Sequence, residues 1–229
     1  MPKKIAVVAA LLVLVTPGGD LPAFVPEIAV YGDLARAAHV AVIVPGSDVD
    51  GERFDVTVGR MARSLHASVG RDDVAVVAWL GYRTPSGLGV DAAGGRLARA
   101  GAVALGEHVR TLPGSVHLLC HSYGSVVCAL ARPSVDDVVF LGSPGVRVDS
   151  ADSVGSAGST RVWAARGGRD WTRWLPPVRL GDLGHGADPV DPEFGAGVFD
   201  VGDIGHDGYF REGTASLRAL GRIAVGEAP

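Results

Sequence analysis

The chain has 229 residues, of which 47% are hydrophobic and 20% charged, and it contains 33 glycines and 14 prolines. This length fits one domain with a buried core better than two domains, and so large an apolar fraction excludes a disordered chain. The net charge of −4, with lysine and arginine scattered singly, excludes the basic surface that a nucleic-acid partner needs.

The first residues have the pattern of a secretory signal peptide. Lys3 and Lys4 precede an uninterrupted apolar run over 5–15, and turn-forming residues follow it. An apolar segment of about ten residues is typical of such peptides, whereas a transmembrane helix needs about 20. We therefore expect residues 1–23 to be removed on export and residues 24–229 to form a secreted domain without a stable membrane span. The alternative is a buried first strand or helix of a cytoplasmic domain.

Apolar runs in the rest of the chain have the length and composition of buried strands. They cover residues 39–44, 74–80, 116–120, 138–141 and 161–165, and each is followed by a turn that contains glycine or serine. Runs without polar alternation are typical of strands that are covered on both faces, as in parallel sheets.

Helical patterns lie between these runs. Apolar residues recur every three or four positions over 54–69 and 97–112, and shorter patterns cover 123–131 and 217–225. Strands that alternate with helices predict a three-layer α/β/α sandwich around a mainly parallel sheet. Ligands bind at the carboxyl ends of the strands in such folds, so we expect the functional residues on the turns that follow the strands.

The turn after the third run has the pattern of a nucleophile elbow. Ser122 stands between an apolar strand and a helix, with the small residues Cys120 and Gly124 two positions before and after it. The tight turn brings these two positions together and points the serine hydroxyl out of the sheet. Glycine is usual at the first of them, and Cys120 replaces it here. The alternative is that Ser122 only caps the following helix.

Cys120 and Cys128 are expected to be free thiols. They are eight positions apart on a predicted strand end and helix, and a disulfide needs Cα atoms within about 7 Å of each other. We therefore expect two buried, small apolar side chains.

The base and the acid that would activate Ser122 should follow it in the order Asp or Glu, then His. We prefer His206, on the turn before the last helix, over His185. Asp170 follows the fifth run through a glycine turn, from where its carboxylate can orient the imidazole. The competing aspartates, each of which could be a turn or cap residue, are Asp182, Asp188, Asp191, Asp200 and Asp203.

The remaining candidates belong to the oxyanion hole and the substrate pocket. We expect the backbone N–H groups of Tyr123 and Ser47 to stabilise the oxyanion. Trp171, Trp174 and Tyr82 are candidate substrate-binding residues, although large aromatics near strand ends are at least as often plain packing. The loop with His185, Asp188 and Asp191 has hard metal ligands, but such clusters with interspersed prolines are more often loops, and we expect no metal and no cofactor.

Several short motifs are spread from about Ile28 to Ile223. They are Gly32-Asp33-Leu34, Val44-Pro45-Gly46, Trp79-Leu80-Gly81-Tyr82, His121-Ser122-Tyr123-Gly124-Ser125, Gly142-Ser143-Pro144-Gly145, Asp188-Pro189, Phe194-Gly195-Ala196 and Gly205-His206-Asp207-Gly208-Tyr209-Phe210. Together they resemble a family of actinobacterial α/β-hydrolases that is known as a domain of unknown function and is similar to serine esterases and lipases. The resemblance implies an α/β-hydrolase fold and a triad that falls on Ser122, Asp170 and His206, with glycine usual at position 120.

We therefore expect a serine hydrolase that cleaves carboxylic esters, of a small molecule or a lipid, through an acyl-enzyme. One alternative is an acyltransferase with the same triad, in which an alcohol or amine replaces water. The other is a non-catalytic binding protein that has kept the fold.

Overall fold

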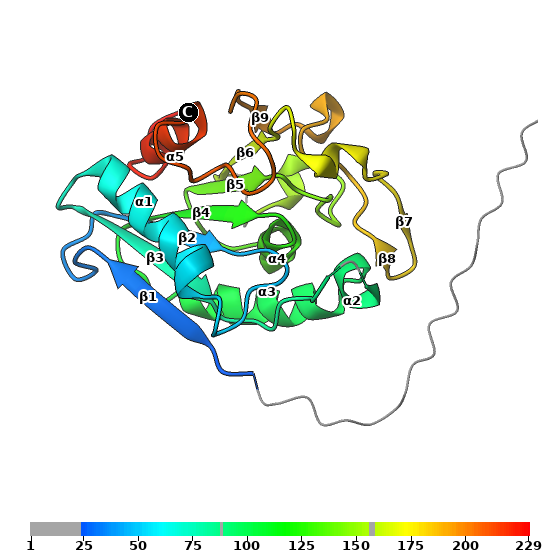
Figure 1. The fold of residues 1–229 in the computed structure, drawn as a ribbon, viewed down its shortest axis with the longest axis horizontal. Helices are drawn as coiled ribbons and strands as arrows, with labels where there is room; N and C mark the ends of the chain where they lie inside the picture. Colours follow the sequence, from blue (N-terminus) through cyan, green and yellow to red (C-terminus); the bar gives the residue numbers. More distant parts are fainter. Residues whose placement is uncertain (1–23, 88, 156–158) are drawn as a thin grey trace, which may run out of the picture.

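The structure is a computed structural model that describes residues 24–87, 89–155 and 159–229. The predicted signal peptide, residues 1–23, lies outside the described residues. The described chain folds around a main sheet with helices on both faces (Figure 1). Within these ranges no helix has the length and apolar character needed to cross a bilayer.

The main sheet has seven strands, and all except the first run in parallel. Across the sheet they follow the order β1 (Glu27–Tyr31), β3 (Val74–Leu80), β2 (His39–Val44), β4 (Ser115–His121), β5 (Asp137–Leu141), β6 (Arg161–Ala165) and β9 (Gly197–Val198). A separate hairpin consists of β7 (Arg179–Leu180) and β8 (Leu183–Gly184).

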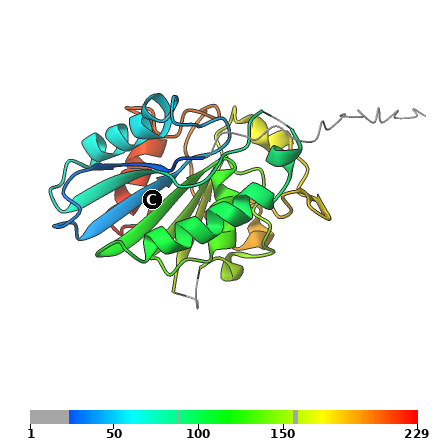
Figure 2. The same cartoon turned by 90° about the horizontal axis from the view of Figure 1, so that it is seen from below.

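Helices cover both faces of the sheet, as Figure 2 shows from below. One face carries α1 (Arg60–Val69), which continues a π-helical turn over Asp55–Gly59, and α5 (Ala215–Ile223). The other face carries α3 (Arg96–Val109) and α4 (Gly124–Ala131). The short α2 (Val90–Ala93) lies near the hairpin. Successive side chains of a strand point to opposite faces, so Val42 packs with the α3 and α4 side and Ile43 with the α1 and α5 side. The predicted three-layer α/β/α sandwich is confirmed.

The strand order predicts a ligand-binding crevice between the carboxyl ends of β2 and β4. After β2 the chain adds β3 on one side, and it then crosses to add β4 on the other side of β2. The turns that leave β2 and β4 therefore diverge to opposite faces, and this is the point of an open α/β sheet at which ligands bind. Val44 and Cys120 are paired in the register at these two strand ends, so the turn over residues 45–48 lies next to Ser122.

Candidate active site

Ser122 occupies a sharp turn between β4 and α4. Its φ is +53°, in the left-handed region that costs a non-glycine residue about 1–3 kcal/mol unless the surroundings hold it there. The surroundings do so here, because the Ser122 N–H donates to the carbonyl of Leu141 at the end of β5 (2.9 Å). Strain of this kind at a serine between strand and helix matches the elbow that the sequence predicts.

Two glycines allow the close packing of this turn. A Cβ on Gly46 would lie 2.6 Å from the Cβ of Ser122, and a Cβ on Gly124 would lie 2.5 Å from the carbonyl oxygen of Val44. Any side chain at either position would therefore push the β2 turn and the elbow apart. The elbow and the turn after β2 form one unit, which brings Ser47 and Ser122 to the same cavity.

The prediction that Cys120 and Cys128 are free is wrong, because the two residues form a disulfide. Their Cα atoms are 6.4 Å apart, although eight positions separate them in the sequence. The prediction treated the strand end and the helix as continuing away from each other. Instead the elbow reverses the chain, so that α4 returns along β4 and Cys128 faces Cys120. The cysteine at the usual glycine position thus ties the helix to the strand that carries Ser122.

His206 and Asp170 continue a chain of hydrogen bonds from Ser122. Nε2 of His206 lies 2.9 Å from Oγ of Ser122, and Nδ1 of His206 lies 2.9 Å and 3.1 Å from the two carboxylate oxygens of Asp170. A carboxylate only accepts, so Nδ1 carries the proton and Nε2 is left to accept from the serine hydroxyl. The three residues selected from the sequence are therefore brought together, in the order that proton transfer from the serine requires.

Further hydrogen bonds fix the carboxylate of Asp170, which is fully buried. Tyr209 donates its hydroxyl proton to Oδ2 (2.6 Å), and Thr172 donates from its N–H (2.9 Å) and its hydroxyl (2.8 Å) to Oδ1. Burial by itself raises the pKa of Asp170, but the hydrogen bonds from His206, Tyr209 and Thr172 outweigh it and hold the pKa well below the ordinary value. Asp170 therefore stays ionised beside the imidazole.

His121 is a neighbour of the site that the sequence did not indicate. Its Nε2 donates to the backbone carbonyl of His206 (2.8 Å), and the two imidazole rings lie 4.7 Å apart. Burial and the nearby His206 lower the pKa of His121 to about 4, so it is neutral near pH 7. His121 therefore holds the loop of His206 against the elbow without adding a charge there.

His185 lines the same cavity, but its hydrogen bond goes to the backbone of α2 and not to Ser122. Its Nε2 donates to the carbonyl of Ala92 (2.8 Å). Asp188 forms an ion pair with Arg166 (2.7 Å), and Asp191 accepts from the N–H of Glu193 at the start of a 3₁₀ turn. Among the residues that the structure describes, no group of three or more His, Cys, Asp and Glu side chains is arranged to hold a metal ion.

A cavity of about 710 Å³ opens above Ser122 and His206. Its walls are mostly apolar side chains, with a few polar ones; they include Val49, Val58, Met61, Pro144, Trp171, Leu175, Pro176, Val178, Asp48, Arg53, His185 and Asp207. Trp171 lies on this wall, and its ring is 5.0 Å from that of His206. An apolar cavity that ends at a serine and an imidazole can hold the acyl part of a substrate next to the reactive groups.

Two of the three aromatic residues proposed for the pocket do not line this cavity. Tyr82 is buried below the elbow, where its hydroxyl donates to the carbonyl of Pro45 (2.7 Å) and its ring stacks between Trp79 and Tyr123. Trp174 is 80% exposed, because the 3₁₀ turn Trp171–Trp174 directs it outward. Tyr82 therefore supports the turn after β2 from beneath, and only Trp171 reaches the site.

The predicted oxyanion donors lie on the two turns that meet above the sheet. Ser47 follows β2, Tyr123 follows Ser122, and both line the cavity. In the part of the chain that the structure describes, neither backbone N–H donates to another group of the protein. A backbone N–H without an acceptor in the protein, on a turn that lines the cavity, can donate to a negatively charged oxygen of a substrate.

Comparisons with known proteins place this geometry in context. The profile of a protein family described as "Alpha/beta hydrolase" matches residues 22–180 of the chain. Uncharacterized proteins of Mycobacterium tuberculosis and Mycobacterium bovis are each 32% identical to it, over 51% of this chain and 56% of theirs. The chain thus spans little more than half the length of the curated relatives it matches.

Solved structures share the fold at low sequence identity. The crystal structure of an esterase named PE8 matches with a TM-score of 0.57 and 12% identity over 88% of this chain and 98% of that chain. Est1E from Butyrivibrio proteoclasticus, solved with ferulic acid bound, matches with 0.54 and 10% over 88% and 96%. A serine hydrolase without a lid from Xanthomonas campestris matches with 0.51 and 15% over 88% of both chains.

Proposed function

Since the chain belongs to the α/β-hydrolase family, we propose that it is a serine hydrolase that cleaves carboxylic esters through an acyl-enzyme. The observation that carries the proposal is the continuous series of hydrogen bonds from Ser122 through His206 to Asp170. In the proposal Ser122 is the nucleophile, His206 the general base and Asp170 the residue that orients the base.

The reaction would run in two halves. Oγ of Ser122 attacks the ester carbonyl carbon while its proton passes to Nε2 of His206, and Asp170 stabilises the resulting imidazolium. The carbonyl oxygen becomes negatively charged and accepts hydrogen bonds from the N–H groups of Ser47 and Tyr123, each worth about 3–4 kcal/mol to the transition state. The alcohol leaves with the proton of His206. Water then gives a proton to His206 and attacks the acyl carbon. His206 returns this proton to Oγ of Ser122 as the bond between Oγ and the acyl carbon breaks, and the carboxylic acid leaves.

The cavity supports an ester substrate and hydrolysis over acyl transfer. Its walls near the surface include the apolar Leu175 and Val178, which suit an acyl chain, whereas Asp48, Arg53 and Asp207 make another part polar. Polar groups at the opening admit water to the acyl-enzyme. An acyltransferase with the same triad needs a pocket that keeps water away from this intermediate.

The disulfide supports the further proposal that the protein is exported. Structural disulfides persist in oxidising compartments and are rare in a reducing cytosol, and Cys120 and Cys128 form one at the elbow. The expectation of a signal peptide over residues 1–23 agrees with this. Fractionation of cells that produce the tagged full chain tests the proposal, because protein that stays in the cytoplasm with free thiols would contradict it.

The proposed function is tested by labelling and by turnover. The purified full chain should react with a fluorophosphonate probe at Ser122 and should hydrolyse short p-nitrophenyl esters. Ser122→Ala should lose the label and lower kcat by about 10⁶-fold while it keeps the fold, as judged by circular dichroism. Equal labelling of wild type and Ser122→Ala, or no labelling of either, would show that Ser122 is not the nucleophile.

A further inference from the structure

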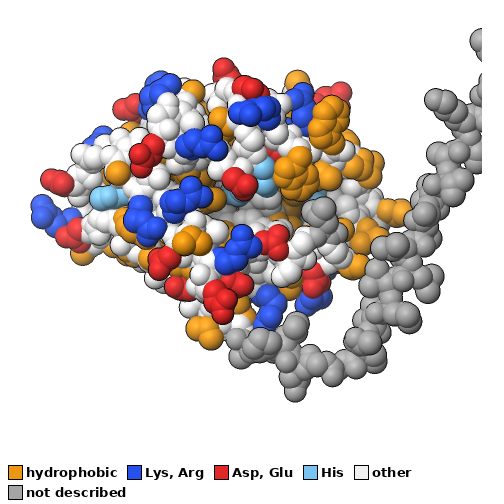
Figure 3. Space-filling model, viewed as in Figure 1, with side chains coloured by type: hydrophobic (Ala, Val, Ile, Leu, Met, Phe, Trp, Pro, Cys, Tyr) orange, Lys and Arg blue, Asp and Glu red, His pale blue; other side chains and the backbone are white. Residues whose placement is uncertain are grey.

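The segment from Trp171 to Leu183 carries an unusual share of the exposed apolar surface. Both of the exposed tryptophans and all three of the exposed leucines of the described residues lie in these 13 positions; together with Val178 they are Trp171, Trp174, Leu175, Leu180 and Leu183. We call these six side chains the apolar platform. Figure 3 shows hydrophobic side chains gathered at the end of the molecule where Figure 1 places β7 and β8. Exposed apolar groups that gather in this way mark interaction surfaces in water-soluble folds.

The platform is continuous with the cavity above Ser122. Trp171, Leu175 and Val178 belong to the cavity wall as well as to the exposed surface. From His206 outward, apolar side chains thus lead from the reactive groups to the tip of the hairpin, where Leu180 is 85% exposed. A long apolar chain that lies on the platform would therefore meet apolar side chains of the cavity wall, Trp171, Leu175 and Val178, on its way to Ser122.

The hairpin that carries the outer half of the platform is held at its turn by contacts with α3 and with neighbouring residues. Asp182, at the turn, accepts from Arg99 (2.8 Å) and from Arg147 (2.9 Å), and Leu183 forms a β-bridge with Gly94. These contacts fix the hairpin on the α2 and α3 side of the cavity. The apolar side chains are therefore presented by an ordered surface and are not covered by packing elsewhere.

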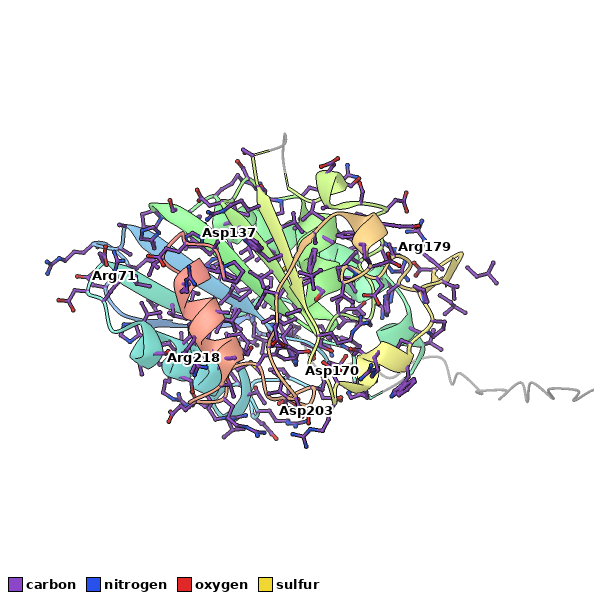
Figure 4. All side chains as sticks on the ribbon, turned by 90° about the horizontal axis from the view of Figure 1, so that it is seen from above. Arg71, Asp137, Asp170, Arg179, Asp203 and Arg218 are labelled. Carbon is purple, nitrogen blue, oxygen red and sulfur yellow. A yellow bond between two sulfur atoms is a disulfide. The ribbon has the colours of Figure 1, made fainter. Side chains whose placement is uncertain are left out.

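The charges of the segment define what the platform can contact. Asp182 is the one acidic residue between positions 171 and 183, and the two arginines that pair with it neutralise it. Arg173 and Arg179 add positive charge, and Arg179 lies at the margin of the molecule in Figure 4. The platform is thus apolar and cationic, although the chain as a whole carries a net charge of −4. Tryptophan and arginine around an apolar surface suit the boundary between acyl chains and anionic headgroups.

We propose that the apolar platform docks the protein on the surface of a lipid aggregate that contains anionic lipid, and that the substrate enters from that surface as a lipid ester with its acyl chain in the cavity. This inference rests on the proposed function, because it names the substrate class of the same site. It also accounts for the position of the platform, since esters with long acyl chains are present in aggregates and hardly at all as free molecules in water.

Binding to vesicles tests the docking step. The full chain should sediment with vesicles of phosphatidylcholine and phosphatidylglycerol, and less with phosphatidylcholine alone. Leu180→Asp, at a position that does not line the cavity, should weaken binding to the mixed vesicles about tenfold or more. Arg179→Gln should weaken it about fivefold, on the mixed vesicles only. The matched control is Val103→Asp on α3, because Val103 is a 64% exposed apolar residue outside the segment, and it should bind as wild type does.

Two results would overturn the docking proposal. One is equal vesicle binding by wild type and Leu180→Asp. Binding through residues 1–23, which are present in every variant, would give this result. The other is a dimer in light scattering that Leu180→Asp dissociates, because the platform would then contact a second copy. An unchanged unfolding midpoint of Leu180→Asp shows that any loss of binding does not come from misfolding.

Turnover separates this inference from the proposed function. Leu180→Asp should hydrolyse dissolved p-nitrophenyl butyrate as wild type does and should hydrolyse emulsified p-nitrophenyl palmitate about tenfold more slowly. If both rates stay unchanged, docking is wrong and the hydrolase stands. If wild type hydrolyses neither ester, the proposed function fails, whereas the vesicle experiment still reports on the platform.

Discussion

Two networks in this molecule are built from the same parts and sit at opposite ends of the strands. At the carboxyl ends, Asp170 accepts from His206, which faces Ser122. At the amino ends, Asp137 accepts from Nδ1 of His117 (2.6 Å), and the other nitrogen of His117 lies 3.2 Å from Nδ1 of His39. Figure 4 shows the two aspartates well apart. Each network is a buried carboxylate, an imidazole and a third polar group.

The two networks differ in what surrounds the carboxylate and where the series ends. Asp137 also accepts hydrogen bonds from Arg161 (2.7 Å and 2.8 Å) and from Nε1 of Trp163 (2.7 Å). The guanidinium of Arg161 therefore neutralises the charge of this carboxylate. Among the described residues, the groups besides His206 that donate to Asp170 are neutral, and the series ends at a strained serine in a cavity. Under the proposed function, the Asp170–His206 pair activates Ser122 because the charge of the carboxylate acts mainly on the imidazole and the imidazole faces an accessible hydroxyl.

The largest effect should come from the carboxylate at the reactive end. Asp170→Asn should lower kcat by about 10⁴-fold, because an amide that donates to Nδ1 leaves the proton of the imidazole on the side that faces Ser122. Steady-state turnover of p-nitrophenyl esters measures this. The matched control is Asp203→Asn, which changes an exposed aspartate next to Arg169 and should keep its turnover. Full activity of Asp170→Asn would mean that His206 does not depend on Asp170.

The corresponding substitution at the other end should act on stability and leave turnover intact. Asp137→Asn should lower the free energy of unfolding by about 3 kcal/mol at pH 7, because it removes the buried negative charge that pairs with Arg161 and leaves one acceptor oxygen for His117, Arg161 and Trp163 in place of two. Urea unfolding measures this. The control Asp73→Asn changes a carboxylate with a similar two-pronged contact to Arg71, but at the exposed surface, and should have little effect.

The pH dependence of the free energy of unfolding of wild type and Asp137→Asn tests whether the charge of Asp137 is what stabilises the fold. Burial raises the pKa of Asp137, but hydrogen bonds from His117, Arg161 and Trp163 outweigh it, so the folded pKa lies below the ordinary value of 3.8. The folded state therefore binds fewer protons, and the contribution is complete above about pH 4 and lost as the pH falls through the folded pKa. The gap between wild type and Asp137→Asn should close below pH 4; a gap that stays constant would exclude the charge as its cause.

The sequence alone predicts most of the sheet, for a physical reason that also explains what it misses. The buried parallel strands, such as β2 and β3, are continuous apolar runs and are found within one residue of their bounds. The antiparallel edge strand β1 alternates between half-buried and exposed residues, and β7, β8 and β9 have two residues each. Such strands are defined by their partners and not by their own composition, so a local pattern does not reveal them.

The site shows the same division between local and long-range information. Ser122 is recognisable because the elbow imposes small residues at fixed spacing. Chain order leaves two histidines and several aspartates, from which the positions on turns after a late strand and before the last helix favour Asp170 and His206. The partners of Asp170 follow no such spacing, because Tyr209 reaches it across 39 positions. The Asp137 network needs the register, in which Asp137 pairs with both His117 and Arg161 on neighbouring strands. The disulfide needs the reversal at the elbow, which a count of eight positions does not contain.

A further histidine, His121, sharpens the comparison, because it is buried and its hydrogen bond goes to a backbone carbonyl and not to an aspartate. His121 donates to the backbone of His206, and burial together with His206 lowers its pKa from 6.5 to about 4. Between pH 6.5 and pH 4 the side chain of His121 is protonated in the unfolded chain and neutral in the folded protein. The free energy of unfolding should therefore fall as the pH drops from 6.5 to 4, by about 3 kcal/mol for this group.

His121→Gln should remove this part of the pH dependence. The amide of glutamine can still donate to the carbonyl of His206, so stability at pH 7 should change little, and the variant should become the more stable protein near pH 4 by up to about 3 kcal/mol. Urea unfolding of both proteins at several pH values measures the difference, in which the other histidines cancel because both proteins share them. If the free energies of unfolding of the two proteins fall in parallel from pH 7 to pH 4, His121 takes up its proton as readily in the folded protein as in the unfolded chain. A buried imidazole beside the elbow could then carry a charge without a hydrogen bond to a carboxylate.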